Sequence, residues 1–156
     1  MMRRKDREII DFEKVISIVD RCECCRIGLV DNGEAYIVPM NFGFEIIDEK
    51  IILYFHGAKE GRKIDLIPEQ KVVTFEMDTN HALVRGETGC SFSFLYQCVM
   101  GKGKMEILTN ENEKIYGLKK VMSHYTGSEL WKLDSKIVDK TCVLKLTVEE
   151  WSCKVH

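Results

Sequence analysis

The sequence predicts a mainly β domain, an antiparallel barrel with helices at its periphery. Three observations favour this fold class. Short apolar runs indicate about six strands, turn signals separate them in meander order, and the chain lacks the strand–helix alternation of a doubly wound sheet. The 156 residues, 45% of them hydrophobic and 31% charged, suit a single domain over residues 1–156 with its own core.

The first third of the chain predicts a helix, a hairpin and a buried strand. Apolar residues recur at helical spacing over residues 9–19, which indicates an amphipathic helix. Strands are expected at residues 26–30 and 35–40, on either side of Asn32-Gly33, a dipeptide typical of two-residue hairpin turns. Pro39 falls near a strand end, where a missing N–H is tolerated.

The remaining elements follow from the same signals. We expect a connection at 41–44, a turn at 48–50, a strand at 51–55 and a short helix from Ile64 that Pro68 limits. A strand at 72–77 precedes a segment, residues 78–89, that is polar and expected to be flexible and exposed. A long strand region at 90–108 contains two glycines that mark a bend or bulge. A helix at 111–124 and a last strand at 142–148 complete the prediction.

Composition excludes several classes of function. The net charge of −2 gives no bulk positive field for nucleic acid or an anionic membrane. The sequence contains no apolar run of the roughly 18 residues that a membrane span needs, and acidic residues interrupt the start too early for a signal peptide. The expected location is therefore the cytoplasm.

The seven cysteines do not indicate a disulfide framework, because their number is odd and their spacing irregular. Cys22, Cys24 and Cys25 cluster, and a structural metal is the alternative explanation. Zinc sites, however, usually need about four ligands in paired spacings. Reduced, mostly buried thiols are the expectation, with no metal site.

The most informative stretch is Leu53 to Leu66, in which a buried strand is expected to turn at Gly57 and lead into a helix. Lys59, Arg62 and Lys63 lie at the start of that helix. Helix N-termini favour anions, and an adjacent arginine and lysine would add a planar fork and a point charge. This pattern predicts a phosphate site; the alternative is a solvated basic turn.

Several stretches together resemble the pyridoxamine phosphate oxidase-like flavoproteins, and most of all their 5-nitroimidazole resistance (Nim) branch. They are Met2-Arg-Arg-Lys-Asp-Arg-Glu8, Gly28-Leu-Val-Asp-Asn-Gly-Glu34, Tyr36-Ile-Val-Pro-Met-Asn-Phe-Gly43, Leu53-Tyr-Phe-His-Gly-Ala-Lys-Glu-Gly-Arg-Lys63, Tyr96-Gln-Cys-Val-Met-Gly-Lys-Gly103 and Met122-Ser-His-Tyr-Thr-Gly127. The resemblance implies an FMN-binding split β-barrel, a homodimer with FMN in clefts at the subunit interface, and a small-molecule substrate.

The resemblance also implies roles for individual residues. One segment would line the edge of the flavin ring through its backbone: Val38, Pro39, Met40, Asn41 and Phe42. A second would run along the ring and the ribityl chain: Tyr54, Phe55 and His56. The phosphate would be held by Arg62 and Lys63, with Lys59 assisting or pointing to solvent. The other subunit would contribute Gln97 and Val99.

His56 is the candidate catalytic residue. As in Nim proteins, it would lie beside the flavin and give a proton or a hydrogen bond to a substrate, since imidazole titrates near neutrality. The alternative is a hydrogen-bonded core histidine. His124 is expected to pack against, or cap, the end of its helix.

Two features of the sequence differ from the family pattern and bear on the function. The C-terminal segment, residues 149–156, has a tryptophan but no arginine, which argues against vitamin B6 oxidation. Cys98 stands where relatives often carry serine. The leading hypothesis is an FMN-dependent oxidoreductase that reduces a small acceptor, for example a nitroaromatic. The alternatives are a flavin-binding module without turnover, a heme-binding barrel with His56 or His124 as axial ligand, and a barrel without cofactor.

Overall fold

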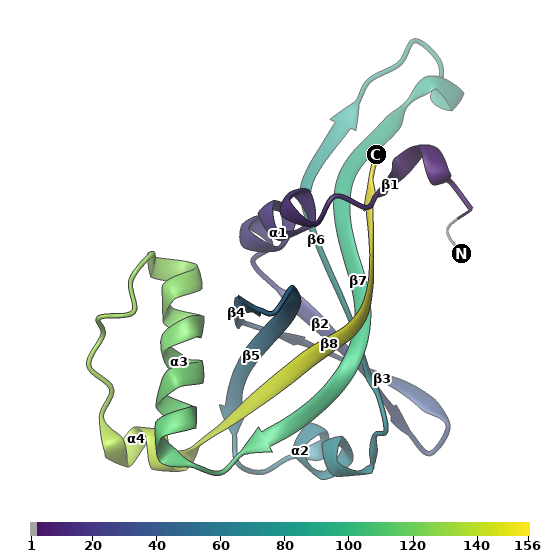
Figure 1. The fold of residues 1–156 in the computed structure, drawn as a ribbon. Helices are drawn as coiled ribbons and strands as arrows, with labels where there is room; N and C mark the ends of the chain where they lie inside the picture. The colour runs from purple at the N-terminus through teal and green to yellow at the C-terminus, as the bar shows by residue number, and fades with distance from the viewer. Residues whose placement is uncertain (1–2) are drawn as a thin grey trace.

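The computed structural model describes residues 3–156, so the first two residues of the predicted domain, including Met2 of the opening motif, lie outside it. One bent antiparallel sheet dominates the fold (Figure 1). Its order is β3 (Glu34–Met40), β2 (Cys25–Asp31), β6 (Val73–Val84), β7 (Ser93–Leu108), β8 (Thr141–Val155), β5 (Lys50–Ala58) and β4 (Phe42–Ile47), and β1 (Glu8–Ile9) pairs with β8. The end strands β3 and β4 do not pair with each other in the described chain, so the barrel stays open. The predicted fold class, an antiparallel split barrel, is confirmed.

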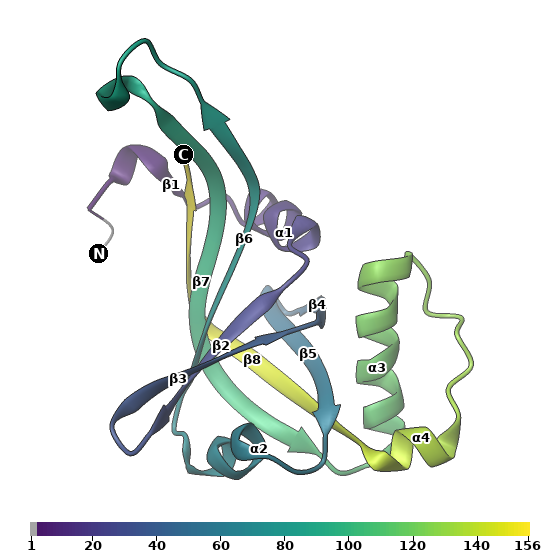
Figure 2. The same cartoon turned by 180° about the vertical axis from the view of Figure 1, so that it is seen from behind.

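Four α-helices lie against the sheet, and Figures 1 and 2 show them from opposite sides. They are α1 (Phe12–Arg21), α2 (Arg62–Leu66), α3 (Glu111–Thr126) and α4 (Ser135–Lys140). Short 3₁₀ turns occur at Lys5–Arg7, Ile67–Glu69 and Gly89–Ser91. The long helix α3 packs on β4 and β5, whereas α2 lies at the end of the barrel where β5 ends. No helix in residues 3–156 is long and apolar enough to cross a membrane.

The N-terminal helix begins later than its apolar spacing predicted. The Asp11 side chain accepts a hydrogen bond from the backbone N–H of Lys14, at 3.3 Å, and so caps α1. Val15, Ile18 and Val19 form its buried stripe. Ile9, which was expected in the helix, instead pairs with Cys153 of β8.

The hairpin prediction is confirmed, and the predicted connection over residues 41–44 is wrong. Asn32 and Gly33 both have positive φ, 49° and 84°, as a primed hairpin turn requires. Residues 42–47 form β4, because their backbone pairs with β5 from Phe42 to Ile47, and this pairing places the Phe42 side chain in the core. The expected turn near residues 48–50 is present, with φ of 48° at Asp48 and 61° at Glu49.

The segment at residues 78–89, expected to be polar, flexible and exposed, is a strand over its first part and lies outside any strand only at residues 85–89. Strand β6 continues to Val84 and pairs with β7 as far as Ser93, with a register shift between Thr79 and Ala82. The resulting two-stranded ribbon extends beyond the body of the molecule (Figure 2). Backbone pairing holds it although most of its side chains are exposed, as was expected of the segment. The expected irregularity near the two glycines of β7 is present between Lys102 and Gly103.

Side chains from the two faces of β5 enter two separate cores. Leu53 and Phe55, each 0% exposed, join the main core inside the sheet. Ile52 and Tyr54 join a smaller core beneath α3, together with Val143 of β8. This alternation fixes which face of the sheet each residue at the end of β5 can reach.

Candidate functional site

The opening of the barrel begins where β3 and β5 diverge. The last pair between β4 and β5 is Phe42 with Phe55, and beyond Phe55 the strand β5 pairs only with β8. Strand β3 pairs only with β2. Two strand edges that pair with no other strand therefore face the opening, residues 38–41 and residues 56–58. Such edges carry backbone N–H and C=O groups that can bind a ligand.

Helix α2 connects the two sides of this opening through its first two side chains. The Arg62 guanidinium contacts one oxygen of Asp31 through Nε and Nη2, each at 2.6 Å, and stacks over the Tyr36 ring at 4.4 Å. Lys63 instead lies across the end of β5, where a Cβ added at Gly57 would be 3.2 Å from its Cε. Arg62 thus contacts the β2–β3 hairpin, and Lys63 contacts β5.

Arg62 and Lys63 lie at the start of the helix, as predicted, whereas Lys59 lies before it. The strand runs on to Ala58 rather than turning at Gly57, because β8 pairs with it throughout. The helix begins after Gly61, whose φ of 124° favours glycine. With five residues, α2 contributes only a small dipole, so attraction for an anion comes mainly from the side chains.

The three cations of the turn differ in how they are engaged. Lys59 makes an exposed ion pair with Asp139 of α4 at 3.6 Å. Arg62 is paired with Asp31, but its side chain remains 56% exposed. Within residues 3–156, no carboxylate lies at ion-pairing distance from Lys63. The Lys63 ammonium and the guanidinium N–H groups that Asp31 does not use are therefore available to an anion.

His56 lies beside this turn but leaves the strand on the other face. Its cross-strand neighbour is Val143, so its side chain points to the α3 side, opposite the face over which Lys63 lies. The residue is exposed, yet surrounding protein atoms lower the pKa of the imidazole by desolvation. At neutral pH the ring is mostly uncharged, with one N–H donor and one acceptor nitrogen.

The side chains of Tyr54 and Phe55 do not face the opening. Phe55 is in the main core, and Tyr54 donates a hydrogen bond to Glu45 at 2.8 Å, beneath α3. Burial raises the pKa of Tyr54 far above its ordinary value, and Glu45 adds to the effect. These residues support the strand from which His56 projects.

Residues 38–42 combine an exposed edge with a buried end. Pro39 and Asn41 are exposed, and Val38 packs partly on the main core. Met40 is buried, and Phe42 is 0% exposed. A ligand at this edge would therefore meet mainly backbone groups and the Asn41 side chain.

Gln97 and Val99 lie elsewhere, on β7, with β2 and β6 between them and β3. The Gln97 side-chain oxygen accepts hydrogen bonds from Arg21, at 2.8 Å, and Asn80, at 2.9 Å. Val99 is 0% exposed. Within this chain these residues are not brought to the opening, and their predicted contribution from a second subunit stays a prediction.

Sequence reasoning missed the residues that hold the site in shape. Asp31 and Tyr36 fix Arg62, yet nothing in the motif indicated that the hairpin would contact α2. The expectation that His124 packs at its helix end is confirmed. Its ring packs against Phe42 in a tilted arrangement, with centroids 4.4 Å apart, and Nε2 donates to the carbonyl oxygen of Cys22 at 2.8 Å.

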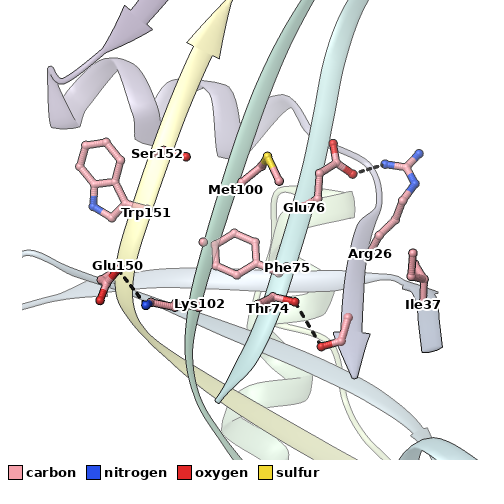
Figure 3. A pocket seen from close by; sticks show the side chains of 12 residues that line it. Arg26, Ile37, Thr74, Phe75, Glu76, Met100, Lys102, Glu150, Trp151 and Ser152 are labelled. Carbon is pink, nitrogen blue, oxygen red and sulfur yellow. Dashed lines mark hydrogen bonds and ion pairs between the residues drawn. The ribbon is translucent and has the colours of Figure 1, made fainter. Parts of the chain in front are cut away.

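A second feature, a cavity of about 620 Å³, lies on the sheet face formed by β2, β6, β7 and β8 (Figure 3). Apolar side chains line part of it, with Ile37 63% exposed and Met100 53% exposed. Ion pairs flank these groups, Arg26 with Glu76 at 3.0 Å and Lys102 with Glu150 at 3.0 Å. None of the predicted flavin residues lines this cavity.

The cysteines are free thiols, and four of the seven are buried: Cys22, Cys25, Cys142 and Cys153. Burial raises the pKa of Cys22 to about 12 and that of Cys153 to about 11. Such thiols are poor nucleophiles at neutral pH. No group of three or more potential metal ligands gathers within residues 3–156.

Comparison with known proteins places this geometry in a family. The family model described as pyridoxamine 5'-phosphate oxidase matches residues 11–155. No curated protein sequence matches the chain significantly. One similar solved structure is a candidate 5-nitroimidazole antibiotic resistance protein from Bacteroides thetaiotaomicron, with 32% identity and a TM-score of 0.82 over 95% of this chain and 86% of that one.

Two further structures share the fold at lower identity. The flavocytochrome Anf3 from Azotobacter vinelandii has 24% identity and a TM-score of 0.82, over 100% of this chain and 72% of that one. An FAD and heme binding protein from Mycobacterium smegmatis has 19% identity and a TM-score of 0.79, over 96% and 73%.

Proposed function

This chain belongs to the pyridoxamine 5'-phosphate oxidase family, and on that premise we propose that it is an FMN-dependent oxidoreductase. It would pass electrons from a reduced donor to a small acceptor, with nitroaromatic compounds as the acceptor class. The acceptor class rests on the similarity to the candidate nitroimidazole resistance protein. One fold serves several chemistries, so the site residues have to support the proposal independently.

The observation that carries the proposal is the pair of cations at the start of α2. Arg62 has N–H donors directed away from Asp31, and Lys63 lies free of carboxylates among the described residues. A guanidinium fork and an ammonium on the same turn suit the terminal phosphate of FMN. Arg62 would share its donors between Asp31 and the phosphate.

The strand edge at residues 38–41 suits the ring of the flavin. Every second residue of β3 directs its backbone N–H and C=O away from β2, and these groups match the amide-like edge of the isoalloxazine. Pro39 removes one donor from this edge, and Asn41 adds a side-chain amide. The backbone at residues 56–58 forms the other side.

When bound, FMN would supply the electron transfer, and the chain would supply binding and a proton. Arg62 and Lys63 hold the phosphate, and residues 38–42 orient the ring. His56, whose side chain leaves β5 on the face opposite Lys63, would hydrogen-bond an acceptor bound on the α3 side of the strand through its N–H or, when protonated, donate a proton to it. Vitamin B6 oxidation is not part of the proposal, because the C-terminal segment lacks an arginine for a substrate phosphate.

We further propose that the protein acts as a homodimer. Ile37 and Met100 are exposed beside the cavity of Figure 3, and the mixture of apolar centre and charged margin is typical of subunit interfaces. The family resemblance implies that Gln97 of a second copy would lie near the flavin in such a dimer. Mass measurement in solution, by light scattering, tests this: a monomer at micromolar concentration contradicts it.

A heme site is a second candidate, because two proteins of this fold are named for heme or cytochrome. His124 is not suited as the axial ligand. Its Nε2 is bound to Cys22, and its Nδ1 is enclosed. His56, with its exposed ring, is the residue that could ligate iron.

The test of the function is turnover. FMN-loaded protein is reduced without oxygen by a nicotinamide donor and then mixed with a nitroimidazole, while the flavin absorbance is followed. Repeated reduction and reoxidation with consumption of the nitro compound supports the oxidoreductase. A flavin that binds but is not cycled by any donor–acceptor pair indicates a storage, sensor or carrier module instead.

A further inference from the structure

We propose that His124 and Tyr125, at the end of α3, are positioning residues that hold Met40–Phe42, the junction between β3 and β4, in the geometry the flavin ring requires. This proposal rests on the proposed function, in which that junction lies at the ring edge. Neither residue has to touch the flavin. They act through the backbone of the junction.

Tyr125 ties the junction to a segment distant in sequence. Its hydroxyl accepts a hydrogen bond from the backbone N–H of Phe42 at 3.2 Å and donates one to the carbonyl oxygen of Glu23 at 2.7 Å. One proton and two lone pairs are enough for both bonds. The hydroxyl therefore fixes the first residue of β4 relative to the end of α1.

His124 makes a parallel connection through its ring. Nε2 donates to the carbonyl oxygen of Cys22 at 2.8 Å, and the ring packs between Phe42, at 4.4 Å, and Phe44, at 5.7 Å. A carbonyl can only accept, so Nε2 carries the proton and Nδ1 is left as an acceptor. Nδ1 is the single buried side-chain nitrogen or oxygen without a partner in residues 3–156. The ring is thus held mainly by its aromatic contacts and one hydrogen bond.

The helix that carries both residues cannot move independently of β4. A Cβ at Gly43 would overlap the backbone of Lys120 and Val121, so strand and helix are in direct backbone contact there. Figure 2 shows α3 standing alongside β4 and β5. Because Gly43 follows Phe42 directly, α3 contacts this part of the chain twice, through its backbone at Gly43 and through the Tyr125 hydroxyl at Phe42.

This rigidity matters because the ring would be oriented by backbone groups, which cannot adapt as side chains do. Binding sites need their groups held within about 0.5 Å of the productive geometry. Met40 and Phe42 are buried, whereas Asn41 between them is exposed. Losing the Tyr125 hydroxyl would free the Phe42 N–H and let Asn41 and its neighbours shift at the ring edge.

The test compares Tyr125→Phe with Tyr116→Phe, a matched control. Tyr116 is also on α3 and its hydroxyl also bonds to β4, but it donates to the Glu45 side chain and makes no bond to the backbone of the junction. Three quantities are measured in each: hydrogen exchange of the Phe42 amide without flavin, the Kd for FMN, and the absorption bands of bound flavin. Thermal melting checks that both variants fold.

For Tyr125→Phe we expect exchange at Phe42 to rise at least about tenfold, the Kd to rise about three- to tenfold, and the flavin bands to shift. For Tyr116→Phe we expect wild-type values within a factor of about two. A band shift marks a positioning effect, because a change in stability alone would not move the spectrum.

The outcomes distinguish the positioning role of Tyr125 from the proposed FMN-dependent activity. Unchanged exchange at Phe42 in Tyr125→Phe means that the hydroxyl does not hold the junction, which overturns the proposal. Faster exchange with wild-type Kd and spectrum means that the hydroxyl holds the junction without affecting the flavin, which also overturns the proposal. If wild-type protein binds no FMN while the exchange effect is present, the proposed function has failed and the positioning role fails with it.

Discussion

The basic turn at residues 59–63 and the junction at residues 40–42 contribute to the proposed site in opposite ways. The turn acts through exposed, charged side chains, and its residues are neighbours in sequence. The junction acts through backbone groups, and its shape is set by Tyr125 and His124 from the end of α3. A chemical function carried by local side chains is visible in a sequence, whereas one carried by backbone position is not.

The two regions also differ in how firmly they are held. The pair of Arg62 with Asp31 is at the surface, where such pairs contribute about 0–1 kcal/mol. It can rearrange when an anion arrives. The junction lies against a close backbone contact and buried aromatic rings, so it is organised before any ligand binds.

The largest effect is expected from removing the charges of the turn. Arg62→Ala with Lys63→Ala should weaken FMN binding about a thousandfold, since each charge-assisted hydrogen bond contributes about 1.5–3 kcal/mol. Flavin fluorescence titration measures this. The fold should persist, because both side chains lie outside the core. Lys71→Ala, an exposed lysine away from the turn, is the control. Unchanged flavin affinity in the double variant would remove the phosphate assignment.

A substitution beside the junction should instead lower the stability of the folded protein. Gly43→Ala is expected to lower the free energy of unfolding by about 3 kcal/mol, because its methyl group would overlap the α3 backbone. Denaturant unfolding measures this. Gly89→Ala, where nothing lies within 4 Å, should change stability by less than about 0.5 kcal/mol. Equal effects of the two substitutions would refute the rigid contact.

Substitution of His56 should affect catalysis but not FMN binding. His56→Gln is expected to lower kcat for the acceptor about a hundredfold, the low end for general acid catalysis, with FMN affinity nearly unchanged. Burial lowers the pKa of the imidazole from 6.5. The protonated form is therefore lost as pH rises through a value below 6.5, so a proton-donating step should be fastest in acid. A pH profile identical in wild type and variant would contradict the role of His56.

The smallest effect should come from Asp31, which competes with the phosphate for Arg62. Asp31→Asn keeps the shape of the side chain but removes its charge, and should tighten FMN binding about threefold at low salt. Calorimetric titration at two salt concentrations measures the change. Weaker binding would mean that Asp31 orients Arg62 more than it competes.

The sequence was sufficient for the barrel, for the Asn32-Gly33 turn and for the clustering of Arg62 with Lys63, because each rests on local periodicity, turn chemistry or motif. It was not sufficient for β4, whose short run of residues resembles a connection until β5 is placed beside it. The same holds for the strand at residues 78–84, where backbone pairing outweighs polar composition. The partners of Arg62 and the contacts of Tyr125 depend on tertiary structure alone.

The most direct test of the account is the visible absorption spectrum of the purified protein, with identification of any chromophore released by heat. The account predicts the bands of an oxidised flavin, release of FMN rather than FAD, and loss of the bands in the Arg62→Ala, Lys63→Ala variant. A Soret band would indicate heme instead. A colourless protein that takes up no added FMN would contradict the account, and the turn would then be a solvated cluster of charges.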